Sequence, residues 1–192
     1  MIRLALLRHG HTAWNRAGRL QGRSDIPLDD IARAELSQLA LPTDWRGADL
    51  VSSPLARAVE TATLVAGRAP RVEPSLIEMN WGRLEGQYGK ALVQDPDSGF
   101  RHIEDWGWQY CPPGGETPDA LRSRLRPWLR ALSRDTVAVC HIGTMRVLMA
   151  MATGWDFAGA APFRIKRNRL FVLDVDKGAL RMTPDIVRLE PR

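Results

Sequence analysis

The chain has 192 residues, of which 44% are hydrophobic and 26% charged, a composition that is ordinary for a soluble globular protein. This length fits one domain with a sizeable core, so we expect residues 1–192 to form a single domain. No apolar run is long enough to span a membrane, and the apolar start of the chain is too short for a signal peptide. These features predict a cytoplasmic protein.

The net charge of +5 indicates an anionic partner, which could be a nucleic acid or a small anionic substrate. The basic residues are nearly all arginine and are scattered, apart from one cluster at 164–169 that is typical of a solvated strand face. Composition does not choose between the two partners. The two cysteines, Cys111 and Cys140, form no CxxC pair, and Cys140 lies in an apolar run that predicts a buried thiol.

The first half of the chain predicts alternating strands and helices. The apolar run Ile2 to Leu7 predicts a strand buried on both faces, and a polar, glycine-bearing loop follows it as far as Pro27. Asp29 predicts the start of a helix that Pro42 stops. A short strand over 49–52 comes next, and Ser53-Pro54 predicts the start of a helix that runs to Gly67.

The second half continues the alternation. A short strand is expected within 71–77, whereas 82–115 is rich in glycine, proline and aromatic residues and gives no clear pattern. Thr117-Pro118 predicts a helix start. The chain then predicts a strand over 136–140, a helix from Gly143 to Thr153, and a hairpin within 163–188. This order predicts an α/β fold, a three-layer α/β/α sandwich with a mostly parallel central sheet.

Four side chains with catalytic potential fall where predicted strands end. His9 and Arg8 close the first strand, and His141 follows the strand over 136–140. Arg57 lies in the first turns of the helix after the strand over 49–52. Because ligands collect at the carboxyl ends of strands in such folds, we expect these imidazole and guanidinium groups to converge at one edge of the sheet.

This combination suits phosphate chemistry. Guanidinium groups match phosphate oxygens in a bidentate manner, and helix N-termini add oriented N–H groups for an anion. A histidine among such cations should have a lowered pKa and be a neutral nucleophile near pH 7. Phosphoryl transfer needs mainly positioning and charge stabilisation, so these residues could support it without a metal.

The same residues lie within sequence segments that occur in a fixed order between residue 2 and about residue 150. These segments are Arg8-His9-Gly10-His11-Thr12-Ala13-Trp14-Asn15, Leu20-Gln21-Gly22, 52–62, Leu76-Ile77-Glu78, Pro113-Gly114-Gly115-Glu116, and Val139-Cys140-His141-Ile142-Gly143 with Arg146. Together they resemble the motifs of the histidine phosphatase superfamily, which includes the cofactor-dependent phosphoglycerate mutases. One departure is Ile142, which stands where the family usually has a glycine.

The resemblance implies a role for each matching catalytic position. His9 would be the nucleophile that becomes phosphorylated. The phosphoryl oxygens would be bound by Arg8, Arg57 and His141. Glu78 would be the general acid for the leaving oxygen and then the base for water, and we prefer it to Glu85.

The resemblance also implies a substrate pocket. Its lining would include Asn15, Gln21, Gly22 and Ile142. No metal is expected, because the family needs none, and we expect no cofactor. The roles of His11, His102 and Glu116 stay open, as does the question whether residues 82–115 form a lid.

We therefore expect the phosphatase branch of the family: a phosphomonoester hydrolase that acts on a small phosphorylated metabolite through a phosphohistidine. Mutases of the family carry an arginine-histidine-tyrosine run after the acid, which Glu78-Met79-Asn80-Trp81 lacks. Two alternatives remain: phosphoryl transfer of the phosphoglycerate mutase type, and a non-catalytic basic module that binds nucleic acid. The expected partner is a small phosphorylated substrate, and neither a nucleic acid nor a membrane.

Overall fold

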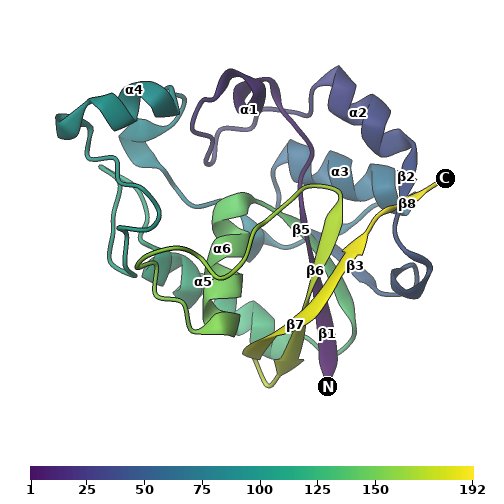
Figure 1. Ribbon diagram of the computed structural model, residues 1–192. Helices are drawn as coiled ribbons and strands as arrows, with labels where there is room; N and C mark the ends of the chain where they lie inside the picture. The colour runs from purple at the N-terminus through teal and green to yellow at the C-terminus, as the bar shows by residue number, and fades with distance from the viewer.

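A six-stranded sheet forms the centre of the computed structural model, which describes residues 1–192 (Figure 1). The strand order is β4-β3-β5-β1-β6-β7. Strands β4, β3, β5 and β1 run parallel, β6 is antiparallel to β1, and β7 is antiparallel to β6. Their bounds are β1 Ile2–Arg8, β3 Asp49–Ser52, β4 Arg71–Val72, β5 Thr136–Cys140, β6 Arg169–Asp176 and β7 Ala179–Arg188. The prediction of a mostly parallel central sheet is confirmed.

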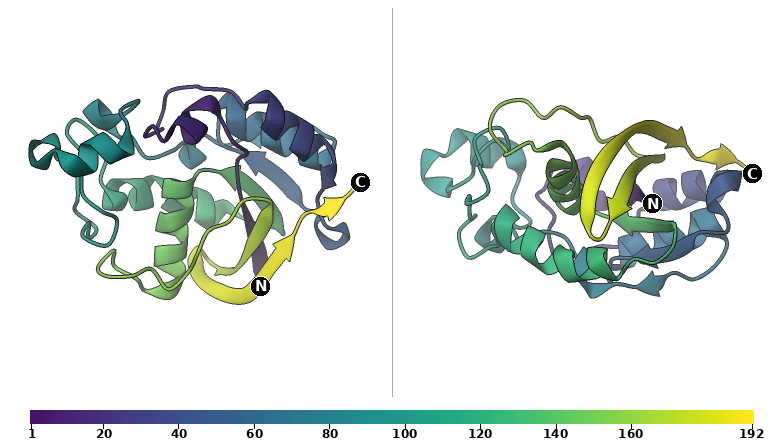
Figure 2. Two further views of the ribbon diagram at one scale, coloured as in Figure 1. Left: turned by 45° about the horizontal axis from the view of Figure 1, so that its top comes forward. Right: turned by 90° about the horizontal axis from the view of Figure 1, so that it is seen from below.

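Helices cover both faces of this sheet, which confirms the predicted three layers (Figure 2). Because side chains alternate along a strand, β1 contributes to a core on each face. Leu4 and Leu6 join one buried cluster with α5 (Pro118–Ala131) and α6 (Ile142–Thr153). Ala5 and Leu7 join the other cluster with α2 (Asp30–Ser37) and α3 (Ala56–Ala66).

Two of the predicted helix starts are confirmed by their caps. The Asp29 carboxylate accepts a hydrogen bond from the N–H of Ala32 at 2.7 Å, and the Thr117 hydroxyl accepts one from Ala120 at 3.0 Å. The predicted stop of α2 at Pro42 is wrong, since the helix ends at Ser37. The reason is a pairing that local pattern does not reveal: β2 (Leu39–Ala40) pairs with β8 (Glu190–Pro191) near the end of the chain.

The predicted helix start at Ser53 is also wrong. Helix α3 begins at Ala56, whose N–H donates to the Asp25 carboxylate at 2.7 Å, so its cap comes from a distant loop. The Ser53 hydroxyl instead contacts Nε2 of His141 at 2.6 Å. Smaller differences are a strand β4 of only two residues, followed by a 3-10 turn at Pro74–Leu76, and β6 starting at Arg169 rather than near residue 163.

Two regions without a clear pattern contain short helices. In the loop after β1, Thr12 and Asn15 form a reciprocal capping box at the start of α1 (Ala13–Ala17). The irregular stretch 82–115 contains α4 (Gly89–Gln94) and the 3-10 turns Gly82–Leu84 and Pro96–Ser98. None of the helices combines the length and the apolar character that a bilayer crossing requires.

Candidate active site

The parallel pairing of β1 with β5 brings the two histidines together. Arg8 lies opposite Cys140 in this pair, and the N–H of His9 donates to the Cys140 carbonyl at 3.0 Å. The residues that follow the two strands therefore share one edge of the sheet. The ring centroids of His9 and His141 are 5.1 Å apart, and both side chains are buried.

A hydrogen bond defines the tautomer of His9. Its Nδ1 lies 2.6 Å from the carbonyl oxygen of Gly10. Because a carbonyl oxygen can only accept, Nδ1 carries the ring proton and Nε2 keeps its lone pair. His9 lines the cavity described below, so the structure presents a neutral imidazole nitrogen of nucleophilic type at the surface of that cavity.

Three buried side-chain nitrogens around His9 have no partner within the protein. They are Nε of Arg8, Nε of Arg57 and Nδ1 of His141, which carries the ring proton when the Ser53 hydroxyl donates to Nε2. The remaining nitrogens of Arg57 are fixed, since they donate to the carbonyls of Ser24 at 2.8 Å and Gly22 at 2.6 Å. Buried polar groups normally have hydrogen-bond partners, and an oxyanion would supply them for all three groups.

The electrostatic environment keeps both imidazoles neutral. Burial, followed by the charges of Arg57, Arg8 and Arg167, holds the pKa of His9 well below its usual value. Burial is also the largest cause of the lowered pKa of His141. Burial, together with Arg167 and Arg146, lowers the pKa of Arg8 as well, but this guanidinium stays charged at neutral pH.

Glu78 lies at the start of α6, where its carboxylate accepts main-chain hydrogen bonds. Oε1 accepts from Met79 at 2.8 Å and Thr144 at 3.0 Å, and Oε2 accepts from Gly143 at 2.9 Å. A side chain at Gly143 would place its Cβ 2.5 Å from Oε1, so only glycine allows this approach. Glu78 is 2% exposed and lines the same cavity as His9.

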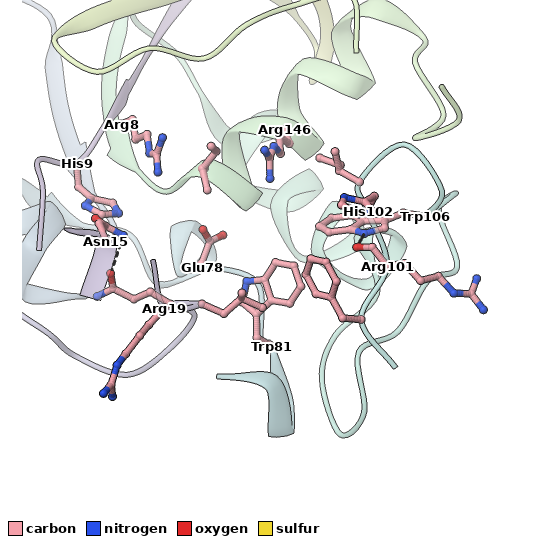
Figure 3. Close-up of a pocket in the computed structure, with 15 residues that line it drawn as sticks. Arg8, His9, Asn15, Arg19, Glu78, Trp81, Arg101, His102, Trp106 and Arg146 are labelled. Carbon is pink, nitrogen blue, oxygen red and sulfur yellow. Dashed lines mark hydrogen bonds between the residues drawn. The ribbon is translucent and has the colours of Figure 1, made fainter. Parts of the chain in front are cut away.

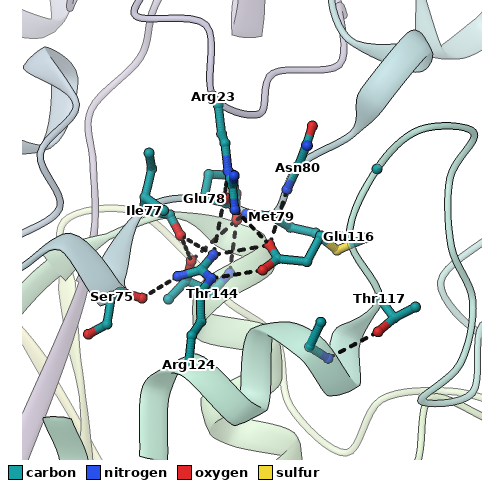
Figure 4. A network of polar contacts seen from close by, with 12 residues as sticks. Arg23, Ser75, Ile77, Glu78, Met79, Asn80, Glu116, Thr117, Arg124 and Thr144 are labelled. Atoms are coloured by element: carbon teal, nitrogen blue, oxygen red, sulfur yellow. Dashed lines mark hydrogen bonds and ion pairs between the residues drawn. The ribbon is translucent and has the colours of Figure 1, made fainter. Parts of the chain in front are cut away.

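The other two glutamates weighed for this site have structural contacts. Glu85 accepts from the N–H groups of Gly22 and Ser24, at 3.1 and 2.5 Å, and so holds the loop that positions Arg57. Glu116 pairs with Arg124 at 2.8 Å. Arg124 in turn donates to the carbonyl of Ile77 at 2.7 Å, beside Glu78 (Figure 4). Neither glutamate lines the cavity.

A cavity of about 340 Å³ opens from His9 (Figure 3). Three of the four predicted pocket residues, Asn15, Gln21 and Ile142, line it. Gly22 does not, because its carbonyl is turned to Arg57 and a Cβ there would lie 2.8 Å from the Met79 carbonyl. Arg57 and His141 are fully buried and do not line it either. The full lining is Arg8, His9, Asn15, Arg19, Leu20, Gln21, Glu78, Trp81, Phe100, Arg101, His102, Ile103, Trp106, Ile142 and Arg146.

Two arginines of the site were given no role from the sequence. Arg167 donates to the carbonyl of His9 at 3.1 Å and to Asn15 at 3.0 Å, so it is not part of a solvated strand face. The loop before β6 carries it over His9. Arg146 lies one helical turn after Ile142 in α6 and lines the cavity. Its place in the motif segment of His141 and its i, i+4 spacing from Ile142 were the signals that could have placed it there.

The far wall of the cavity comes from the irregular stretch and its neighbour Trp81. Trp81 packs edge-on against Trp106, with centroids 5.4 Å apart, and stacks with Phe100 at 6.5 Å. His102 also lines the cavity, whereas His11 does not. Residues of the stretch 82–115 therefore build a wall of the cavity, which local sequence pattern did not indicate.

Comparisons with known proteins, by sequence and by structure, indicate the same family. A sequence profile described as histidine phosphatase superfamily (branch 1) matches residues 4–184. A metal-independent phosphoserine phosphatase of Arabidopsis thaliana is 30% identical over 168 residues, which cover 81% of this chain and 71% of that protein. A crystal structure of phosphoglycerate mutase from Thermus thermophilus is similar with a TM-score of 0.76 and 32% identity, covering 98% of this chain and 100% of that chain.

Another relative is larger than this chain. A bifunctional protein of Mycobacterium tuberculosis is 33% identical over 158 residues, which cover 79% of this chain but 41% of that protein. The chain thus spans less than half the length of this relative.

Proposed function

Because the chain belongs to branch 1 of the histidine phosphatase superfamily, we propose that it hydrolyses a small phosphomonoester through a phosphohistidine at His9. The observation that carries this proposal is the free Nε2 of His9 beside three partnerless buried nitrogens of Arg8, Arg57 and His141. Nε2 would attack phosphorus and form the N–P bond while the ester P–O bond breaks. Arg8, Arg57 and His141 would stabilise the charge on the transferring group.

Glu78 is the proposed proton donor to the leaving oxygen. Its Oε2 accepts a single main-chain hydrogen bond, so it has a further lone pair that can carry the proton. In the second half of the reaction Glu78 would take a proton from water, which attacks phosphorus, breaks the N–P bond and restores His9. The products are the alcohol and inorganic phosphate.

The size of the cavity supports a small substrate. About 340 Å³ lies within the range of small-molecule sites, and the lining combines apolar and charged side chains. We therefore propose a phosphorylated metabolite rather than a nucleic acid as the partner.

Mutase activity is the second candidate, favoured by the likeness to the Thermus phosphoglycerate mutase. Hydrolysis is preferred because Met79-Asn80-Trp81 follows Glu78 in place of the arginine-histidine-tyrosine run. Incubation with 3-phosphoglycerate distinguishes the two: free phosphate indicates hydrolysis, and 2-phosphoglycerate indicates transfer.

The test of the mechanism is His9→Ala. We expect phosphate release from 4-nitrophenyl phosphate to fall by about 1,000-fold or more at every pH, because the nucleophile is gone. The wild-type protein, quenched in alkali during turnover of a radiolabelled ester, should retain an acid-labile label that the variant lacks. Undiminished turnover by a folded His9→Ala protein would contradict the proposal.

A further inference from the structure

Arg146 is a charged side chain of the cavity that makes no hydrogen bond or ion pair with any other residue. It lies between Arg8 and Trp106 on the cavity wall (Figure 3). The opposite charge that acts on it is that of Glu78, whose carboxylate is already held by the N–H groups at the start of α6. Burial lowers the pKa of Arg146, which means that its charge is poorly solvated.

An arginine in this situation is unfavourable in the free protein. A partly buried charge loses hydration, and no protein group compensates for the loss. An anionic ligand group in the cavity would compensate, because the guanidinium fork matches a carboxylate or a phosphate. The position of Arg146 therefore indicates an anion on the ligand.

The phosphoryl group that would react with His9 already has other candidate donors. Arg57 and His141 are fully buried beside His9, and their partnerless nitrogens, with Nε of Arg8, are available for its oxygens. Arg146 instead lies about 6 Å farther along α6 than Ile142, given the rise of four helical residues, and on the side of the aromatic wall. It can reach an anion on the part of the substrate that leaves.

We propose that Arg146 binds a second anionic group, a carboxylate or a second phosphate, close to the ester oxygen of the leaving group. This inference rests on the proposed function, since it assumes that His9 takes the phosphoryl group. Trp81, Phe100 and Trp106 then provide apolar contact for the carbon part of the leaving group. The substrate class is a small phosphomonoester that is also an acid.

Matched probes test this proposal. Phosphoglycolate carries a carboxylate, ethane-1,2-diol bisphosphate carries a second phosphate, and 2-hydroxyethyl phosphate carries neither. Wild type should prefer one or both of the doubly anionic probes in kcat/KM, and the preferred probe identifies the second group. Arg146→Gln should lower kcat/KM for that probe by about 10- to 100-fold, mainly through KM, because a charged hydrogen bond is lost. For 2-hydroxyethyl phosphate the change should stay within about 3-fold.

Two further variants sharpen the result. Arg146→Lys keeps the charge without the fork and should restore part of the preference. Arg126→Gln removes the same charge from an exposed position on α5 and should leave the preference unchanged. Equal losses on all probes in Arg146→Gln would assign Arg146 to the transferred phosphoryl group and overturn the proposal. The proposal would also be overturned if the wild-type protein showed no preference in kcat/KM among the three probes.

Failure of the proposed function is separable from failure of this inference. If wild type releases no phosphate from any probe, the proposed hydrolysis fails. Calorimetric binding of the same probes to His9→Ala, with and without Arg146→Gln, still measures the anion preference. Equal affinity of His9→Ala for phosphoglycolate, the bisphosphate and 2-hydroxyethyl phosphate would overturn the assignment of Arg146.

Discussion

At the scale of single residues, the site holds an excess of positive charge around a neutral histidine. Arg8, Arg57 and Arg167 all act on His9, and Arg146 acts on Arg8. The sequence predicted a lowered pKa for His9 from its cationic neighbours, but burial is the largest cause and the charges add to it. Burial depends on the three-dimensional packing of the strand end, which a single sequence position does not reveal.

Arg167→Gln tests how much the charge of Arg167 contributes to the lowered pKa of His9. Arg167 opposes protonation of His9, so its removal should raise the histidine pKa toward the ordinary value near 6.5. The acid limb of kcat/KM should move to higher pH, and activity at mildly acidic pH should fall. NMR titration of the His9 ring measures the shift directly.

Two controls separate charge from structure in this experiment. Arg167→Lys keeps the charge and should leave the pKa of His9 near the wild-type value. Arg164→Gln removes a charge from an exposed residue of the same loop and should change little. If the lysine and glutamine variants shift the pKa equally, the hydrogen bonds of Arg167, and not its charge, are responsible.

At the scale of elements, helix α5 and Glu116, just before it, fix the segment that carries Glu78. Arg124 donates to the main chain at Ser75 and Ile77, and Glu116 accepts from the N–H of Asn80 at 3.3 Å (Figure 4). The segment has little regular structure of its own, since only the 3-10 turn Pro74–Leu76 lies within it. Its position therefore depends on contacts from α5 and from the start of α6.

Arg124→Gln should misplace Glu78 without touching the cavity. We expect a loss of about 2 kcal/mol in the free energy of unfolding, because several hydrogen bonds from a charged donor disappear. We also expect kcat for an alkyl phosphate, whose leaving oxygen needs a proton, to fall more than kcat for 4-nitrophenyl phosphate. Urea unfolding and steady-state kinetics measure both. Arg126→Gln, on the same helix but exposed, is the matched control, and equal losses on the two esters would argue against positioning of the acid.

At the scale of the whole molecule, local sequence patterns predicted the strands, helix caps and strand-end residues that depend on local interactions. The apolar runs of β1 and β5 and the caps Asp29 and Thr117 need only near neighbours, and the histidines at the strand ends follow from the parallel sheet. The contacts that the sequence did not predict join residues far apart in the chain. Ser53 binds a histidine 88 positions away, and Arg167 reaches the main chain at His9, 158 positions away.

The cavity wall is a further long-range feature, because it depends on a core residue beyond α6. Phe157 is fully buried and stacks on Trp106 at 5.8 Å, while Trp108 packs edge-on against it at 5.0 Å. Its carbonyl also accepts from the N–H of Gly107 at 3.2 Å. Trp106 lines the cavity, so we expect packing in this core to affect the shape of the cavity.

Phe157→Ala, compared with Phe171→Ala, tests this coupling. Both side chains are buried in the same cluster and neither lines the cavity, but Phe157 stacks on Trp106, whereas Phe171 lies in β6 away from that stack. Each truncation should lower the free energy of unfolding by about 3–5 kcal/mol through the cavity that it leaves. Only Phe157→Ala should also raise KM, because Trp106 loses its stacking partner while His9 keeps its environment. Urea unfolding and kinetics on one ester measure both effects, and an equal rise of KM in the two variants would show that the change follows from lost stability alone.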